Sequence, residues 1–181
     1  MKKVMGLSCV ILLVLAAVAI PACGQEDKSQ RPSPAAAAHC AFADGKTVHI
    51  DYSSPRMKDR KIFGGLVPYG EVWRTGANEA TTFVTTADLT VGDKDVPAGS
   101  YTIFTIPEAN KWTLIVSKKT GEWGIPYPGE QFELVRAPMT ASKTSSPVEN
   151  FTISFDQAGA ACTLNVEWEN TRASVKISEK K

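Results

Sequence analysis

The sequence predicts an all-β fold, a single antiparallel β-sandwich, and two observations lead to this prediction. Apolar and polar residues alternate with a period of two in several short runs, as they do in strands with one buried face. The 181 residues also include 13 glycines and 11 prolines scattered along the chain, which favours many turns over long helices. Short strands separated by turn residues are typical of a sandwich.

The first residues predict export from the cytoplasm. Lys2 and Lys3 precede an uncharged apolar run over residues 4–20. The Ile-Pro-Ala-Cys sequence at 20–23 then resembles a lipobox, the site that lipoprotein signal peptidase reads. Proline in the second position departs from the usual small or hydroxylated residue. We therefore keep plain secretory cleavage and a retained membrane anchor as alternatives.

A lipoprotein-type signal peptide over residues 1–22 would leave Cys23 as the acylated N-terminus. Gly24 stands where an aspartate would favour retention in the inner membrane. The expected location is therefore the cell envelope, as an outer-membrane lipoprotein facing the periplasm or otherwise as a secreted protein. The lipid anchor is the only membrane contact that we expect.

Residues 23–37 predict a flexible tether in front of the domain. They are polar at first, continue with two prolines and end in alanines. Such a segment cannot bury enough apolar surface to offset the entropy of ordering it. The β-sandwich domain is expected over residues 38–178.

The strands follow from the alternating runs. They are expected at residues 39–42, 47–52, 81–86, 89–91, 100–106, 111–116, 132–135, 151–155, 162–168 and 172–177. The turn at 156–159 is expected to join two of them as a hairpin.

The first hairpin has two possible registers. A two-residue loop, Asp44-Gly45, would place Cys40 on the face opposite Val48. A three-residue loop starting at Ala43, with Gly45 left-handed, brings the apolar residues to one face, and we prefer it. That face would carry Cys40, Phe42, Val48, Ile50 and Tyr52.

The same register sets His39 opposite His49 on the outer face of the hairpin. These are the two histidines of the sequence, so no further imidazole is available to complete a metal site. We interpret them as a solvated pair and predict neither a metal nor a cofactor.

Cysteine usage predicts one disulfide. Cys9 lies in the signal peptide and Cys23 is the lipidation site, which leaves Cys40 and Cys162 in an oxidising compartment. A bond between them would close a loop of more than one hundred residues. Two separate buried thiols are the alternative.

Residues 53–80 interrupt the alternation and are too long for an ordinary connection. Their aliphatic and aromatic content argues against disorder, so we expect an ordered loop that covers one end or face of the sandwich, with Trp73 packed against it.

The loop also carries a family signature. It comprises residues 51–56 (DYSSPR), 60–70 (RKIFGGLVPYG) and 72–81 (VWRTGANEAT), followed by 97–107 (PAGSYTIFTIP), 151–153 (FTI) and Trp168. This pattern resembles the bacterial family catalogued as domain of unknown function 2911, over about residues 38–177. The resemblance implies a secreted or lipid-anchored β-rich protein, and it implies no activity and no catalytic residues.

Polar and aromatic side chains of the loop are the candidates for a ligand site. They are Asp51, Arg56, Arg60, Tyr69, Trp73, Arg74, Asn78 and Glu79. A structural interpretation competes with this one: Arg74 would pair with Glu79, or Arg56 with Asp51, to fix the loop.

Three classes of function remain. We favour a non-catalytic binding or accessory module whose arginine and aromatic side chains hold a small molecule, a glycan or an envelope protein. The alternative is a glycan-acting hydrolase that uses Asp51 and Glu79 as paired carboxylates. The third is an assembly protein that recruits a partner through exposed strand edges. The formal charge of +1 argues against binding to nucleic acid.

Overall fold

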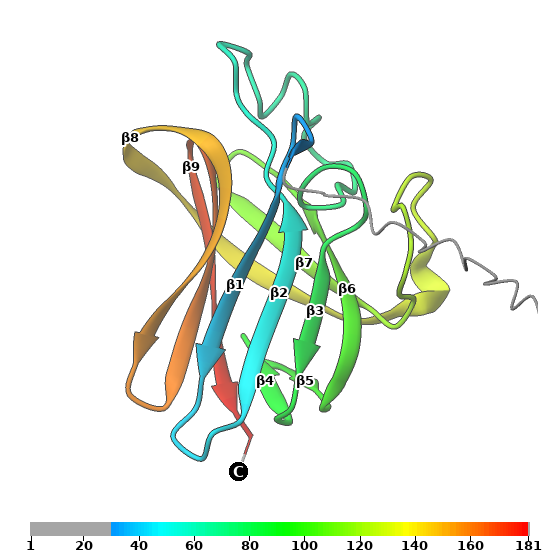
Figure 1. Ribbon diagram of the computed structural model, residues 1–181, viewed down its shortest axis with the longest axis vertical. Helices are drawn as coiled ribbons and strands as arrows, with labels where there is room; N and C mark the ends of the chain where they lie inside the picture. The colour runs from blue at the N-terminus through cyan, green and yellow to red at the C-terminus, as the bar shows by residue number, and fades with distance from the viewer. Residues whose placement is uncertain (1–29, 181) are drawn as a thin grey trace, which may run out of the picture.

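The computed structural model describes residues 30–180, and over this range the chain is all-β without an α-helix (Figure 1). The strands are β1 (Ala35–Ala41), β2 (Thr47–Ser53), β3 (Thr82–Thr85), β4 (Leu89–Val91), β5 (Lys94–Val96), β6 (Gly99–Ile106), β7 (Lys111–Ser117), β8 (Glu133–Ala158) and β9 (Ala161–Glu179). Every strand pair is antiparallel. The predicted all-β antiparallel fold is confirmed. The predicted signal peptide and Cys23 lie outside the described residues.

All strands belong to one open sheet in the order β1-β2-β3-β6-β7-β8-β9-β4-β5. Figure 1 shows β1, β2, β3 and β6 in front, while β7 and the first part of β8 pass behind them. β8 then bends and descends beside β1. The sheet thus folds over itself and encloses one core between two layers, although backbone pairing continues from one layer to the other.

The bend of β8 coincides with an irregular stretch of its pairing with β9. The register shifts between Lys143 and Val148 and again between Val148 and Thr152. Such irregularities bend a strand and increase its local twist. They allow one long hairpin to contribute to both layers of the core.

The first hairpin has the register with the three-residue loop. Phe42 N–H donates to the carbonyl of Lys46 at 2.8 Å, and Gly45 has φ 86°. His39 lies opposite His49. The predicted apolar face is buried and consists of Cys40, Phe42, Val48, Ile50 and Tyr52.

A disulfide joins Cys40 in β1 to Cys162 in β9, as predicted. Both cysteines are buried. The bond ties the edge strand of the front layer to the hairpin behind it. Gln157 adds a hydrogen bond from its Nε2 to the carbonyl of Ala41 at 2.8 Å between the same two regions.

Several elements differ from the expectation. β5 was not predicted, and β9 is one strand where the sequence predicts two, at residues 162–168 and 172–177. β1 begins at Ala35, before the expected start of the domain at residue 38. Ala158 pairs with Ala161, so the last hairpin turns at residues 159–160 rather than over 156–159. β8 is continuous where the sequence predicts two separate strands, because its mostly exposed middle has little apolar alternation and pairs only irregularly with β9.

Candidate functional site

The loop between β2 and β3 is fixed to the sheet at two points. Near its start, Met57 N–H donates to the carbonyl of Glu149 in β8 at 2.8 Å. Near its end, Trp73 and Thr105 of β6 exchange two backbone hydrogen bonds of 2.8 and 2.9 Å. The loop is therefore an ordered part of the domain, as expected.

Part of the apolar content of the loop is buried. Ile62, Phe63 and Val67 are inaccessible or nearly so, whereas Leu66 and Tyr69 remain 50% and 48% exposed. Leu66 sits in a tight turn in which Val67 N–H donates to the carbonyl of Ile62 at 2.9 Å. The turn directs its tip away from the core, which leaves these two apolar side chains at the surface.

Trp73 joins the loop to an aromatic cluster of the core. Its indole stacks on Trp168 of β9 with ring centroids 6.0 Å apart and an interplanar angle of 17°. It also meets Phe151 edge to face at 5.1 Å and donates from Nε1 to the carbonyl of Gly76 at 3.2 Å. The expectation that Trp73 packs against the sandwich is confirmed.

The segment after Trp73 has an unusual backbone. Thr75 and Asn78 have φ of 55° and 56°, and Gly76 has φ 152°. A β-branched residue seldom adopts the left-handed region, because its Cβ substituents crowd the backbone. Thr75 is held there by a hydrogen bond between its Oγ1 and Thr105 Oγ1 at 3.1 Å, and Thr81 Oγ1 donates to its carbonyl at 2.7 Å. Strained conformations of this kind concentrate at functional sites.

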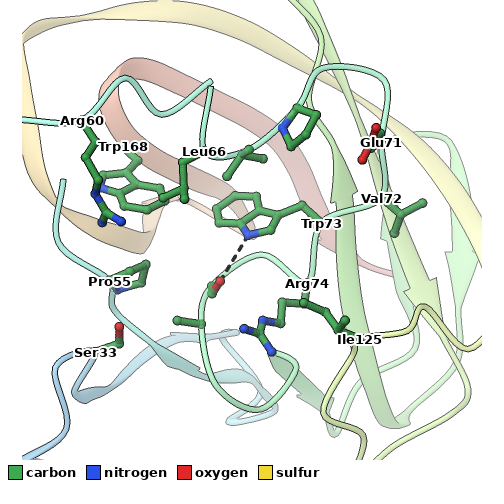
Figure 2. Close-up of a pocket in the computed structure, with 14 residues that line it drawn as sticks. Ser33, Pro55, Arg60, Leu66, Glu71, Val72, Trp73, Arg74, Ile125 and Trp168 are labelled. Atoms are coloured by element: carbon green, nitrogen blue, oxygen red, sulfur yellow. Dashed lines mark hydrogen bonds between the residues drawn. The ribbon is translucent and has the colours of Figure 1, made fainter. Parts of the chain in front are cut away.

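A cavity of about 450 Å³ lies beside this segment, and Trp73 is at its centre (Figure 2). Trp73 forms the aromatic wall, backed by the buried indole of Trp168. Leu66, Val67 and Ile125 add aliphatic side chains. The predicted loop therefore borders a hollow large enough for a small ligand.

Arg60 and Arg74 supply the positive charge of the cavity, and Glu71 supplies a carboxylate. The exposed Arg60 side chain donates from Nε to the carbonyl of Met57 at 2.9 Å and from Nη2 to that of Arg56 at 2.6 Å. Among residues 30–180, neither Arg60 nor Arg74 forms a salt bridge with a carboxylate.

Arg74 is held by a different set of groups. Its Nη1 donates to the carbonyls of Asn78 and Trp123, the latter at 3.2 Å, and its guanidinium lies 5.5 Å from the centroid of the Trp123 ring. Burial lowers the pKa of Arg74, and the negative charge of Glu79 partly offsets this effect. The side chain therefore carries a partly desolvated charge at the cavity wall.

The expected ion pairs of the loop are not formed. Glu79 accepts hydrogen bonds on both carboxylate oxygens from Nη1 of Arg31, at 3.0 and 2.8 Å, rather than pairing with Arg74. Arg56 donates to the carbonyl and the hydroxyl of Ser54, at 3.1 and 2.9 Å. Asp51 is bonded to His49 at 3.0 Å instead. The partners Arg31, Ser54 and His49 were not considered in the sequence-based pairing.

The N-terminal segment before β1 also contributes to this region. Asn78 Nδ2 donates to the carbonyl of Ser33 at 3.1 Å, and Ser54 N–H donates to the carbonyl of Pro34 at 2.9 Å. Ser33 itself lines the cavity. Residues that the sequence assigns to the tether thus form part of the cavity wall.

The predicted ligand-site residues lie in different parts of the structure. Arg60, Trp73 and Arg74 meet at the cavity. Asp51 and Glu79 line a separate depression of about 340 Å³. The remaining candidates, Arg56, Tyr69 and Asn78, line neither of these hollows.

Glu71 was not among the predicted candidates of the loop, and three further cavity residues outside residues 53–80 were missed because they come from distant parts of the chain. They are Ser33, Ile125 and Trp168. Trp168 was noted only for its place in the family pattern and in an alternating strand. The sequence around Ser33 and Ile125 contains no local signal for a binding wall.

Two further properties of the described range bear on the site. No group of three or more His, Cys, Asp or Glu side chains within residues 30–180 is arranged to hold a metal ion. Over the same residues, no helix has the length and apolar character needed to cross a membrane.

Comparison with known proteins places these features in one family. The family model described as "Protein of unknown function (DUF2911)" matches residues 33–177. A search of curated proteins and a search of solved structures found no match.

Proposed function

This chain belongs to the DUF2911 family of unknown function, and we propose that it is a non-catalytic binding module of the cell envelope. The module would be exported and lipid-anchored through Cys23. Its ligand would occupy the cavity beside Trp73.

One observation supports this proposal most directly. The cavity combines two stacked indoles with two guanidinium groups that have no carboxylate partner among residues 30–180. Indole faces stack on sugar rings and other flat apolar groups, and guanidinium groups bind anionic or hydroxyl-bearing groups. Such a mainly apolar hollow with a few polar groups is the usual form of a small-molecule site.

The chemistry of the cavity favours binding over catalysis. Glu71 is its one carboxylate among the described lining residues, so the paired carboxylates of a glycoside hydrolase are not assembled there. The other charged groups of the cavity are the guanidinium groups of Arg60 and Arg74, a side-chain type that is a poor general base.

The hydrolase alternative would have to operate in the depression that Asp51 and Glu79 share. There both carboxylate oxygens of Glu79 accept hydrogen bonds from Nη1 of Arg31. This carboxylate is therefore already engaged by a protein group, which argues against a role in acid–base work on a substrate. The binding module remains the better-supported function.

A thermal-shift screen with variants of exposed residues tests the proposal. Neutral and acidic sugars, amino acids and short peptides are screened for a rise in the melting temperature of the purified protein. The rise should be lost in Leu66→Arg and Ile125→Arg, because both residues line the cavity while being 50% and 66% exposed. Tyr69→Arg is the matched control, since Tyr69 is similarly exposed and lines another hollow.

The control should respond to the ligand as the unaltered protein does. A screen in which no compound raises the melting temperature would contradict the proposal. The same holds for a shift that persists in both Leu66→Arg and Ile125→Arg.

A further inference from the structure

The hydrogen bonding of Arg74 leaves one edge of its guanidinium group available. Both of its hydrogen bonds to other residues start from Nη1 and end on the carbonyls of Asn78 and Trp123. Nε and Nη2 donate to no acceptor among residues 30–180. Neither atom is fully buried. These two donors therefore stay accessible on the Nε/Nη2 edge.

This edge has the geometry that recognises a carboxylate. Nε–H and one Nη2–H of a guanidinium point in parallel, so each can donate to one oxygen of the same carboxylate. Arg60 differs in this respect, because its Nε and Nη2 are already engaged by the carbonyls of Met57 and Arg56. Of the two cavity arginines, Arg74 is the one that offers the bidentate edge.

The surroundings of Arg74 add an energetic reason for binding an anion. The guanidinium is partly buried, and the carboxylate that acts on its charge, Glu79, has both oxygens bonded to Arg31. A charge-assisted hydrogen bond is stronger where water is partly excluded. Figure 2 shows Arg74 and Trp73 on the wall of the same cavity, so a ligand bound to Arg74 could extend to the indole.

We infer that the ligand of this cavity carries a single carboxylate, which binds the Nε/Nη2 edge of Arg74 while an adjoining ring or apolar group contacts Trp73. This inference rests on the proposed function. Glu71 lines the same cavity and repels additional negative charge, which favours a singly charged carboxylate over a phosphate dianion. A carboxylated sugar and the C-terminal carboxylate of a peptide share this chemistry.

Two matched pairs of probes test the inference. The first pair is methyl glucuronide and methyl glucoside, which differ in the carboxylate. The second is acetyl-leucine and acetyl-leucine amide. Binding is followed as the shift of the Trp73 Nε1–H signal in NMR spectra of the purified ¹⁵N-labelled protein.

In at least one pair, the carboxylate should bind about tenfold more tightly than its neutral partner. Arg74→Lys should abolish this preference, because lysine keeps the charge and loses the planar edge. Arg136→Lys is the matched control and should retain the preference, because Arg136 pairs with Glu130 and Glu133 outside the cavity. The pair that shows the effect identifies the source as a sugar or as a peptide terminus.

Three results would count against the inference, and they separate it from the proposed function. If neutral and carboxylated probes bind equally well, the cavity is a binding site and the carboxylate assignment is wrong. If Arg74→Lys keeps the preference, another group recognises the carboxylate. If no probe shifts the Trp73 signal, both the inference and the proposed function are contradicted.

Discussion

At the scale of single residues, the segment from Trp73 to Asn78 depends on backbone conformations that few side chains permit. Gly76 has φ 152°, and its carbonyl accepts the Trp73 indole N–H. A Cβ at this position would lie 3.0 Å from the carbonyl oxygen of Ser53 and 3.2 Å from Thr81 Oγ1. The glycine therefore sets both the turn and the position of the cavity wall.

Gly76→Ala should lower the free energy of unfolding by about 2–3 kcal/mol, because backbone strain adds to steric overlap. Gly45→Ala is the matched control: Gly45 also has a positive φ, but a Cβ there would meet nothing within 4 Å. The control should lose about 1 kcal/mol from strain alone. Urea denaturation monitored by tryptophan fluorescence measures both, and equal losses would refute the steric argument.

Arg74 offers a second prediction at this scale. Its protein partners are two backbone carbonyls and an exposed indole rather than a buried carboxylate. Arg74→Met should therefore lower the free energy of unfolding by only about 1 kcal/mol. A buried ion pair with Glu79 would instead cost about 3–5 kcal/mol when broken. A loss of that size in urea denaturation would show that Arg74 has a structural partner.

At the scale of elements, the N-terminal segment and the loop between β2 and β3 stabilise each other. Arg31 binds Glu79, while Ser33 and Pro34 accept hydrogen bonds from the side chain of Asn78 and the backbone of Ser54. The side chains of Arg31 and Glu79 are 17% and 38% exposed, so solvent screens their attraction only in part.

A double-mutant cycle with Arg31→Met and Glu79→Gln should give a coupling energy of about 0.5–1 kcal/mol in thermal or urea unfolding. The control cycle uses Lys94→Met and Asp93→Asn, whose side chains are 45% and 67% exposed. Its coupling should be close to zero. A coupling near zero for Arg31 and Glu79 as well would mean that their contact does not fix the loop.

Strands differ in how far their sequence predicts them. The first hairpin could be predicted because alternation and the left-handed Gly45 are local properties of the sequence. The middle of β8 could not, because its residues are mostly exposed and pair only irregularly with β9 between Lys143 and Thr152, so no regular alternation marks the strand.

The candidate site, too, could be predicted from the sequence only in part. Trp73 and Arg74 stand in a loop whose composition already suggested a site. Ser33 and Ile125 reach the cavity only through tertiary folding. Glu79 is bonded to Arg31, which the sequence assigns to the tether.

At the scale of the whole molecule, the bond between Cys40 and Cys162 connects the two layers of the folded sheet across 122 positions of sequence. Replacing both cysteines with alanine should lower the free energy of unfolding by about 4–5 kcal/mol, because the unfolded chain regains its conformational freedom. Urea denaturation of this variant and of the oxidised protein measures the difference. A loss below about 1 kcal/mol would show that the covalent link contributes little.

The proposed attachment to the membrane would depend on Cys23. Cys23→Ser should transfer the protein from the membrane fraction to a soluble or unprocessed form, as cell fractionation and immunoblotting would show. Normal cleavage together with unchanged membrane association would rule out the acyl anchor.

The position of Ser33 on the cavity wall has a geometric consequence for a chain anchored at Cys23. The connection from Cys23 to Gln30 spans at most roughly 25 Å when fully extended, which is less than the thickness of a lipid bilayer's hydrocarbon core. The anchor would thus keep the cavity close to the bilayer surface. Candidate ligands are then best sought among molecules concentrated at that surface, such as the head groups and carbohydrate chains of membrane-associated compounds.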